Sequence, residues 1–360
     1  MTEKIYEPEP TTNYLSPLKM EATAPYDPVL SNMPMELREV LYPLGFPLEI
    51  TTNSPEVVAA ARESWGCFPK AFAKAPLRFR VGVMGEGGGA ALPVPRHRAW
   101  LHLITTVADS ENFVVIDMNQ GVAFGWLTQA SLVDRVYLRY YFLEGPVLCM
   151  LQHLYLVPVH AACVSFAGRG VLQCGDSGAG KSSLAYACAR KGWTFVADDT
   201  VSLIRDQSER KVIGNPYRIR FKPDGAKLFP ELSKQQVVEQ VSGDRAIELA
   251  TATVPEITTA LMSPVDYVVF LNRRDGNAPG LVPLSKQRAD SWFKKEICYG
   301  DEDVRQAQAA SLQNLLSAEL LELRYRDLAT AVDLLEAHVR EGAAYRPAES
   351  AVSLPREENA

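Results

Sequence analysis

A glycine-rich segment followed by a lysine and a serine is the part of this sequence best suited to bind phosphate. Residues 175–182 read Gly-Asp-Ser-Gly-Ala-Gly-Lys-Ser and fit the spacing GxxxxGK[ST]. In that pattern the glycines let consecutive backbone N–H groups point into one concavity, and the lysine reaches the terminal phosphates. The serine hydroxyl is then a ligand of Mg²⁺. The segment therefore predicts binding of a nucleotide or another polyphosphate.

Two adjacent carboxylates follow a short distance downstream. Asp198 and Asp199 come directly after an apolar run, which predicts a strand that ends at this pair. Because the carboxyl ends of parallel strands face one crevice, we expect both side chains to lie near the glycine-rich segment. One carboxylate there can hold Mg²⁺, and the other can accept the proton of an attacking hydroxyl. The alternative is that the pair caps a turn or a helix.

The elements that must position these residues form a strand–loop–helix unit. Residues 159–166 and 171–174 are apolar runs that predict strands. A helix is expected over 183–191, with Gly192 at the position where many helices end. A strand before the glycines and a helix after them is the context in which this pattern binds phosphate, and it argues against a chance glycine-rich turn.

With these flanks the sequence resembles HPr kinase/phosphorylase. The matching residues are 170–172, 175–182, 190–192 and 197–199. The resemblance implies an α/β fold, in which a P-loop nucleotide-binding domain of the phosphoenolpyruvate carboxykinase/HPr kinase type is joined to a smaller N-terminal α+β domain. His160 lies where that family has a functional histidine, although an isolated histidine in an apolar run is otherwise typical of a protein core.

The resemblance also implies roles for individual residues. Asp198 would accept the proton, with His160 and Lys181 completing the catalytic group. The candidate ligands of Mg²⁺ are Ser182, Asp199 and Asp224. The candidate nucleotide-binding residues are Gly175, Asp176, Ser177, Gly178, Ala179, Gly180, Lys181, Ser182, Ser183, Arg218 and Arg220.

The sequence departs from the family beyond residue 205. HPr kinases carry a Glu-Ile-Arg-Gly-Leu-Gly signature whose glutamate binds metal, and Arg218 stands at that position here. This makes Asp224 the candidate substitute ligand, and it counts against strict specificity for HPr and against phosphorylase activity. On a strand Arg218, Arg220 and Lys222 share one face. That face is either a solvated surface or a positive wall for phosphate charge.

The amino-acid composition and the positions of helix-breaking residues indicate the class of protein and its domains. The chain has 360 residues, of which 47% are hydrophobic and 22% charged, as in a globular protein of about two domains. We expect a flexible arm over 1–35, a small α+β domain over 36–145, an HPr kinase-like domain over 146–340 and a flexible tail over 341–360. The boundary between the two folded domains is placed at the dipeptide Gly145-Pro146, which is expected to break a helical stretch.

Together these expectations describe an ATP- and Mg²⁺-dependent serine kinase-type phosphotransferase with a Walker A loop. The acceptor is expected to be a serine-type hydroxyl on a protein or peptide. A small-molecule kinase on the same core is one alternative, and a non-enzymatic nucleotide-sensing regulatory or assembly module is another. The net charge of −6 counts against a nucleic-acid partner, and the start of the chain favours a cytoplasmic protein. No membrane partner is expected, because charges, glycines and prolines interrupt the apolar stretches well before the ~20 residues of a membrane span. The resemblance leaves a homo-oligomer open.

Overall fold

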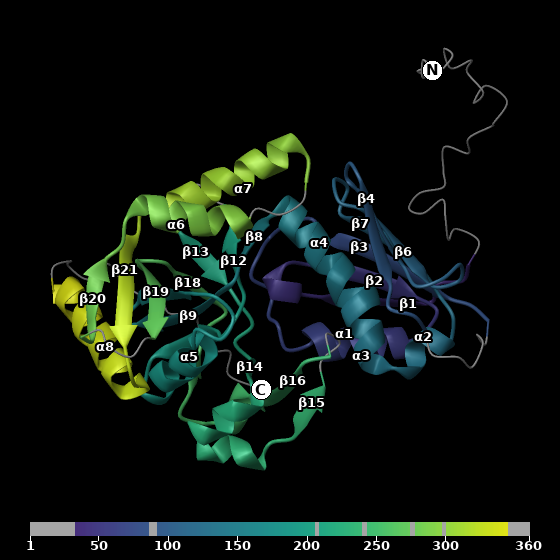
Figure 1. The fold of residues 1–360 in the computed structure, drawn as a ribbon. Coiled ribbons are helices and arrows are strands. Elements are labelled where there is room, and N and C mark those ends of the chain that lie inside the picture. Colours follow the sequence, from purple (N-terminus) through teal and green to yellow (C-terminus); the bar gives the residue numbers. More distant parts are fainter. Residues whose placement is uncertain are drawn as a thin grey trace, which may run out of the picture.

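The computed structural model describes residues 33–85, 92–205, 209–239, 243–273, 278–296 and 300–344. It has a mixed α/β fold with two sheets of seven strands, one of four and one of three. The first large sheet and the second lie at opposite ends of the molecule, with the smaller sheets drawn between and below them (Figure 1). The predicted α/β class is confirmed. The predicted arm and tail lie mostly outside the described residues.

The first large sheet has the strand order β1-β2-β3-β7-β6-β5-β4, and β2, β3 and β7 run parallel. Its strands are β1 (Leu37–Leu41), β2 (Leu48–Thr52), β3 (Leu77–Val83), β4 (Arg96–Trp100), β5 (Leu103–Val107), β6 (Phe113–Asp117) and β7 (Val122–Leu127). A short 3-10 turn, η1 (Pro43–Gly45), joins the first two. Helix α1 (Pro55–Trp65) follows β2, and it begins where Ser54 and Pro55 predict a helix start.

A helical stretch follows β7. It consists of α2 (Ala130–Val133), α3 (Arg135–Tyr137), the π-helix η2 (Leu138–Glu144) and α4 (Gly145–Leu154). The predicted break at Gly145 and Pro146 is wrong, because η2 runs directly into α4 with helical dihedral angles at the junction. Pro146 lies in the first turn of α4, where a missing N–H leaves no intrahelical bond unmade.

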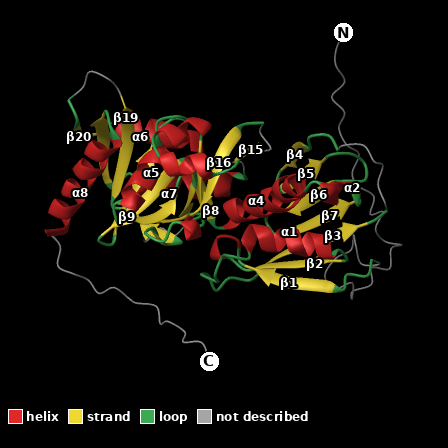
Figure 2. Cartoon of the chain, turned by 90° about the horizontal axis from the view of Figure 1, so that it is seen from below, coloured by secondary structure: helices red, strands yellow, loops and turns green. Residues whose placement is uncertain are grey.

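Helix α4 packs into the core of the first large sheet through Val147, Met150 and Leu151. In Figure 2 it lies with α1 beside that sheet, in the half of the molecule away from α8. The predicted domain limits stay a prediction. We propose to move the boundary between the two folded domains from residue 145 to about residue 155, since α4 belongs with the first core.

The second large sheet has the order β17-β11-β9-β10-β19-β21-β20. Its strands are β9 (Ala161–Phe166), β10 (Arg169–Cys174), β11 (Thr194–Ala197), β17 (Thr258–Thr259), β19 (Tyr267–Arg273), β20 (Gly280–Pro283) and β21 (Glu319–Tyr325). Strands β10, β19 and β21 are parallel to one another, and β9 is antiparallel to both β10 and β11. Strands β10 and β11 therefore end at the same edge of the sheet.

Helices cover both faces of the second sheet. On one face α5 (Lys181–Arg190) packs against α8 (Leu328–Ala344), and both contribute to one hydrophobic cluster. On the other face α6 (Lys286–Phe293) and α7 (Glu302–Leu315) contribute to a second cluster. The sheet is thus buried on both sides, which leaves its strand ends as the places where polar groups can meet a ligand. Helix α8 continues to Ala344, past the predicted start of the tail.

The two smaller sheets connect to the same region. One contains β8 (Leu156–Val159), β12 (Val201–Ile204), β13 (Lys211–Ile213) and β18 (Met262–Pro264), and the other β14 (Arg218–Phe221), β15 (Val237–Glu239) and β16 (Arg245–Ala250). The remaining 3-10 turns are η3 (Pro223–Lys227), η4 (Pro230–Lys234), η5 (Thr251–Thr253) and η6 (Lys294–Glu296). The predicted single strand over 159–166 is divided at His160, where the chain passes from β8 into β9 of a different sheet. No helix in the described ranges is both long and apolar enough to cross a membrane.

Candidate functional site

The carboxyl edge of the second sheet collects the residues that the sequence singled out. Strand β10 leads into the glycine-rich loop (residues 175–180), and β11 ends directly before Asp198 and Asp199. Because β9 is antiparallel to β10, its first residue pairs with Cys174, the last of β10. His160, which precedes β9, is thereby brought to the same edge. The topology places the loop, the histidine and the carboxylate pair together.

The glycine-rich loop turns tightly from β10 into α5. Gly178 and Gly180 have φ angles of +85° and +99°, a conformation that residues with a Cβ rarely adopt. Gly180 is the N-cap of α5, and no side chain in the described part of the chain caps this helix. Its first backbone N–H groups lack intrahelical partners and carry the positive end of the helix dipole. Tyr325 of β21 holds the loop, since its hydroxyl donates to the Ala179 carbonyl at 3.2 Å.

Lys181, the first residue of α5, turns its ammonium group inward. The side chain is only 4% exposed, and Nζ donates to the Gly175 carbonyl at 2.9 Å and to His160 Nε2 at 2.8 Å. It also lies 3.7 Å from Asp199 Oδ1. Because an ammonium group only donates, Nε2 of His160 accepts, which puts the imidazole proton on Nδ1. Burial lowers the pKa of Lys181, and the nearby Asp199 charge opposes this.

Asp198 is half-buried and has a fixed orientation. Its Oδ2 accepts a hydrogen bond from the backbone N–H of Arg220 at 2.7 Å, which ties it to β14. Burial raises the pKa of Asp198 to about 6, with the Arg220 hydrogen bond opposing the rise and the Asp199 charge adding to it. Ser182 lies next to it, with Oγ 3.4 Å from the Asp198 carbonyl. A carboxylate whose pKa lies near neutrality is well matched to accepting a proton.

Arg218 and Arg220 share one face of β14, as the alternation predicts, and both pair with Glu248 of β16. Arg218 Nη1 lies 3.1 Å from Oε1 and Arg220 Nε lies 3.2 Å from Oε2. Burial on its own would raise the pKa of Glu248, but Arg220 and Arg218 outweigh it and lower that pKa. The arginine face is therefore partly neutralised. Nothing local in the sequence points to Glu248, since its role depends on the register between two strands.

The start of β14 also contacts the first region of the molecule. Arg218 Nη2 lies 3.5 Å from the carbonyl oxygen of Glu63 in α1. The ring of Tyr217 packs edge-on against Phe68, just beyond α1, with centroids 5.2 Å apart. One short strand thus contacts both the end of α1 and, through Arg220, the carboxyl group of Asp198.

The three residues predicted to bind a metal ion do not all lie together. Ser182 and Asp199 lie at the loop, whereas Asp224 is exposed on η3. Within the described ranges no three or more His, Cys, Asp or Glu side chains are arranged to hold a metal ion. Magnesium ions at phosphoryl-transfer sites take several ligands from phosphate and water, so a hydroxyl and one carboxylate at the loop fit such an ion. The metal role of all three residues stays a prediction.

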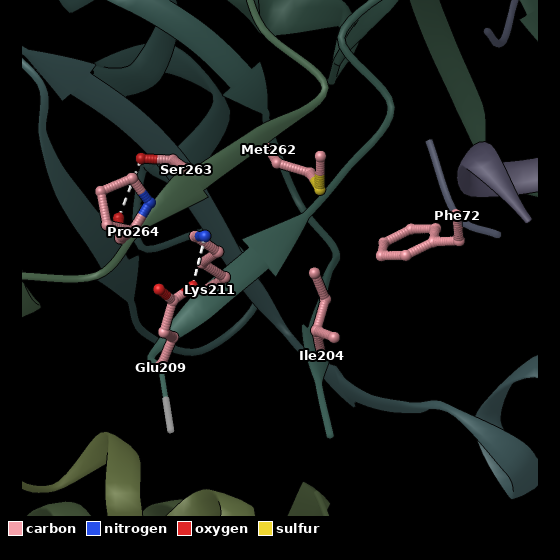
Figure 3. A pocket seen from close by; sticks show the side chains of 7 residues that line it. All are labelled: Phe72, Ile204, Glu209, Lys211, Met262, Ser263 and Pro264. Carbon is pink, nitrogen blue, oxygen red and sulfur yellow. Dashed lines mark hydrogen bonds and ion pairs between the residues drawn. The ribbon is translucent and has the colours of Figure 1, made fainter. Parts of the chain in front are cut away.

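A separate recess lies away from these residues. It has a volume of about 260 Å³ and is lined by Phe72 and by Ile204, Met262 and Pro264 of the four-stranded sheet and its neighbours. Figure 3 shows Phe72 facing this sheet and the ion pair between Lys211 and Glu209 on the opposite side. None of the residues predicted for catalysis lines this recess.

Comparisons with known proteins bear on the same stretch of chain. Residues 155–222 match the model of the HPr Serine kinase C-terminal domain. The HPr kinase/phosphorylase of Shouchella clausii is 47% identical over 58 residues, which is 16% of this chain and 18% of that protein. That of Enterococcus faecalis is 43% identical over 61 residues, which is 17% and 19%. The matches thus span less than a fifth of these relatives.

A solved structure was also matched. The Hpr(Ser) kinase/phosphatase from Coxiella burnetii aligns with 52% of this chain and 93% of its own, at 14% identity and a TM-score of 0.29. The sequence matches alone place the stretch that contains the site among kinase-family proteins. More particularly, residues 155–222 are similar to the C-terminal domain of HPr serine kinases, and the likeness of this chain to that family is carried by this stretch.

Proposed function

We propose that the protein is an ATP- and Mg²⁺-dependent phosphotransferase that transfers the γ-phosphate to a serine-type hydroxyl on a protein or peptide. The observation that carries the proposal is the meeting of three groups at one sheet edge. These are the uncapped N-terminus of α5, the buried ammonium of Lys181 and the carboxyl group of Asp198. The serine acceptor follows from the likeness to HPr kinases rather than from any contact in the site.

In this proposal the glycine-rich loop and the first turn of α5 bind the phosphates. Their backbone N–H groups and the helix dipole favour an anion there. Lys181 exchanges its bond to His160 for a bond to the terminal phosphates. The Nε2 atom of His160, which accepted from Lys181, then accepts a hydrogen bond from the acceptor substrate. A bound Mg²⁺ ion would be held by Ser182 and Asp199 and would neutralise part of the phosphate charge.

Asp198 accepts the proton in the proposed transfer. The acceptor oxygen forms a bond to the γ-phosphorus, the bond from that phosphorus to the β–γ bridging oxygen breaks, and ADP leaves. The hydroxyl proton passes to Asp198 Oδ1, because Oδ2 is occupied by the Arg220 N–H. A carboxyl group with a pKa of about 6 is mostly ionised at neutral pH and is still basic enough to take that proton.

Transfer of labelled phosphate tests the proposal. The full chain is incubated with γ-labelled ATP, Mg²⁺ and a library of serine-containing peptides, and the products are identified by mass spectrometry. We expect phosphoserine in wild type and its loss in Lys181→Ala, because that ammonium is the buried cation at the loop. Phosphate found only on small metabolites would favour a small-molecule kinase. ATP binding without transfer to any acceptor would favour a nucleotide-sensing module.

A further inference from the structure

A second lysine stands over the glycine-rich loop. Lys222 directly follows β14, and its ammonium nitrogen lies 3.7 Å from the point where a Cβ on Gly178 would be. The side chain is exposed, so it approaches the loop from solvent, whereas Lys181 is buried beneath it. The two cations come from different elements, one from α5 and the other from the end of β14.

The backbone of Lys222 is held in place. Pro223 follows it, which restricts Lys222 to an extended conformation, and its φ and ψ angles are −63° and 153°. Its carbonyl accepts a hydrogen bond from Gly225 N–H at 2.8 Å. Two residues earlier, the bond from Arg220 N–H to Asp198 ties β14 to the site. The position of Lys222 beside the loop is therefore fixed by its flanks, and only its side chain remains adjustable.

Lys222 differs from the other cations of the site in having no anionic partner among the described residues. Lys181 contacts His160, Gly175 and Asp199, and Arg218 and Arg220 share Glu248. The Lys222 ammonium makes no ion pair or hydrogen bond with any part of the chain that the structure describes. A phosphate group can therefore engage Lys222 without displacing an existing interaction, whereas Lys181 must first exchange one.

Resting on the proposed function, we propose that Lys222 is a phosphate-binding residue that clamps the terminal phosphate of a polyphosphate nucleotide onto the glycine-rich loop. The ligand it selects is an anion of high charge density at the loop centre, above Gly178. The loop N–H groups and Lys181 act from below, and Lys222 acts from the solvent side. Charge supplied from both sides fits phosphate groups that carry several negative charges.

Calorimetric titration of the full chain with ATP and Mg²⁺ tests this. We expect Lys222→Gln to weaken ATP affinity about tenfold, as for the loss of one charge-assisted hydrogen bond. Lys222→Arg keeps the cation and should stay within about twofold of wild type. The matched control is Lys227→Gln, which removes an exposed lysine from the adjoining η3 and should change nothing. The deficit of Lys222→Gln should shrink as salt is added.

The outcomes separate this inference from the proposed function. If Lys181→Ala loses ATP affinity but Lys222→Gln binds like Lys227→Gln, the clamp is wrong and the kinase proposal stands. If Lys222→Gln unfolds at a lower temperature than wild type without ligand, a loss of affinity that Lys222→Arg fails to restore would mean a structural role and overturn the clamp. A wild-type chain that binds neither ATP nor inorganic pyrophosphate overturns both proposals.

Discussion

The two seven-stranded sheets use their parallel strand ends in different ways. In the first sheet the polar groups at this edge satisfy one another. Asn53, after β2, exchanges two hydrogen bonds with the backbone of Val83 in β3, at 2.8 and 2.9 Å. Ser54 then caps α1 by accepting from Val57 N–H. In the second sheet the corresponding helix, α5, follows Gly180 as its N-cap, and no side chain of the described residues caps it.

The difference teaches how one kind of edge can serve either stability or binding. A serine cap uses up a backbone donor of the helix, and a glycine in a left-handed conformation leaves the donors open. The second edge also holds a buried cation and a carboxyl group of raised pKa. Such groups cost folding free energy unless a ligand or partner compensates them. The first edge is therefore expected to matter for stability and the second for ligand binding and chemistry.

The largest expected effect at the second edge is the loss of phosphoryl transfer in Asp198→Asn. Loss of the proposed base should lower phosphoryl transfer at least about hundredfold, while ATP affinity stays near that of wild type. Single-turnover transfer and calorimetric titration measure the two quantities. Asp303→Asn is the control, because that carboxyl group is exposed in the first turn of α7 and has no predicted role in the site. Equal transfer by Asp198→Asn and wild type would remove the role of base from this residue.

The pH dependence of transfer should follow the same carboxyl group. Its pKa is raised to about 6, and a base acts only when deprotonated. Transfer should therefore be full above this value and fall about tenfold for each pH unit below it. Rates of kcat/KM from pH 5 to pH 8 provide the measurement. A profile that stays flat through pH 6 would contradict the assignment of Asp198 as the group that titrates.

A smaller effect is expected for Tyr325→Phe. The change removes the hydrogen bond to Ala179, so the loop loses one support and ATP affinity should fall about fivefold. Tyr267→Phe is the matched control, since that hydroxyl contacts Arg169 at 3.1 Å, at the opposite end of its strand from the loop. If both variants lose affinity equally, general destabilisation of the second sheet explains the loss better than loop support.

The smallest effect on function should come from Ser54→Ala at the first edge. Loss of the α1 cap should cost about 1 kcal/mol in the free energy of unfolding and leave ATP affinity unchanged. Urea denaturation measures the first quantity and titration the second. A drop in ATP affinity without a matching loss of stability would contradict the assignment of stability to the first edge and ligand binding to the second.

The structural features that can be predicted from the sequence are those with a local sequence pattern. The start of α1 follows from Ser54 and Pro55, and the loop and α5 follow from the glycine, lysine and serine spacing. The contacts that complete the site are not local. Tyr325 reaches Ala179 across 146 positions of the chain, and Arg218 meets Glu248 across 30. Such partners are set by strand order and register, which one sequence does not state.

Two sequence expectations failed for a related reason. The apolar run over 159–166 was expected to form one strand, but apolar character does not show that the chain changes sheet at His160. The dipeptide Gly145-Pro146 is typical of a helix end, but proline is also compatible with the first turn of a helix. Here Pro146 lies in the first turn of α4, which directly follows the π-helix η2. The apolar run and the Gly-Pro dipeptide are each compatible with two local structures. Tertiary packing, which the local sequence does not show, determines which of the two forms.

The contacts of β14 have a mechanical consequence. Tyr217, directly before the strand, packs against Phe68 just beyond α1, and Arg218 lies near Glu63 of α1. Two residues after Arg218, the backbone N–H of Arg220 holds Asp198. Because one short segment contacts α1 and also holds Asp198, we expect a displacement of α1 to reach the Asp198 carboxyl group through β14. The orientation of the proposed base is therefore coupled to the packing between the two large sheets.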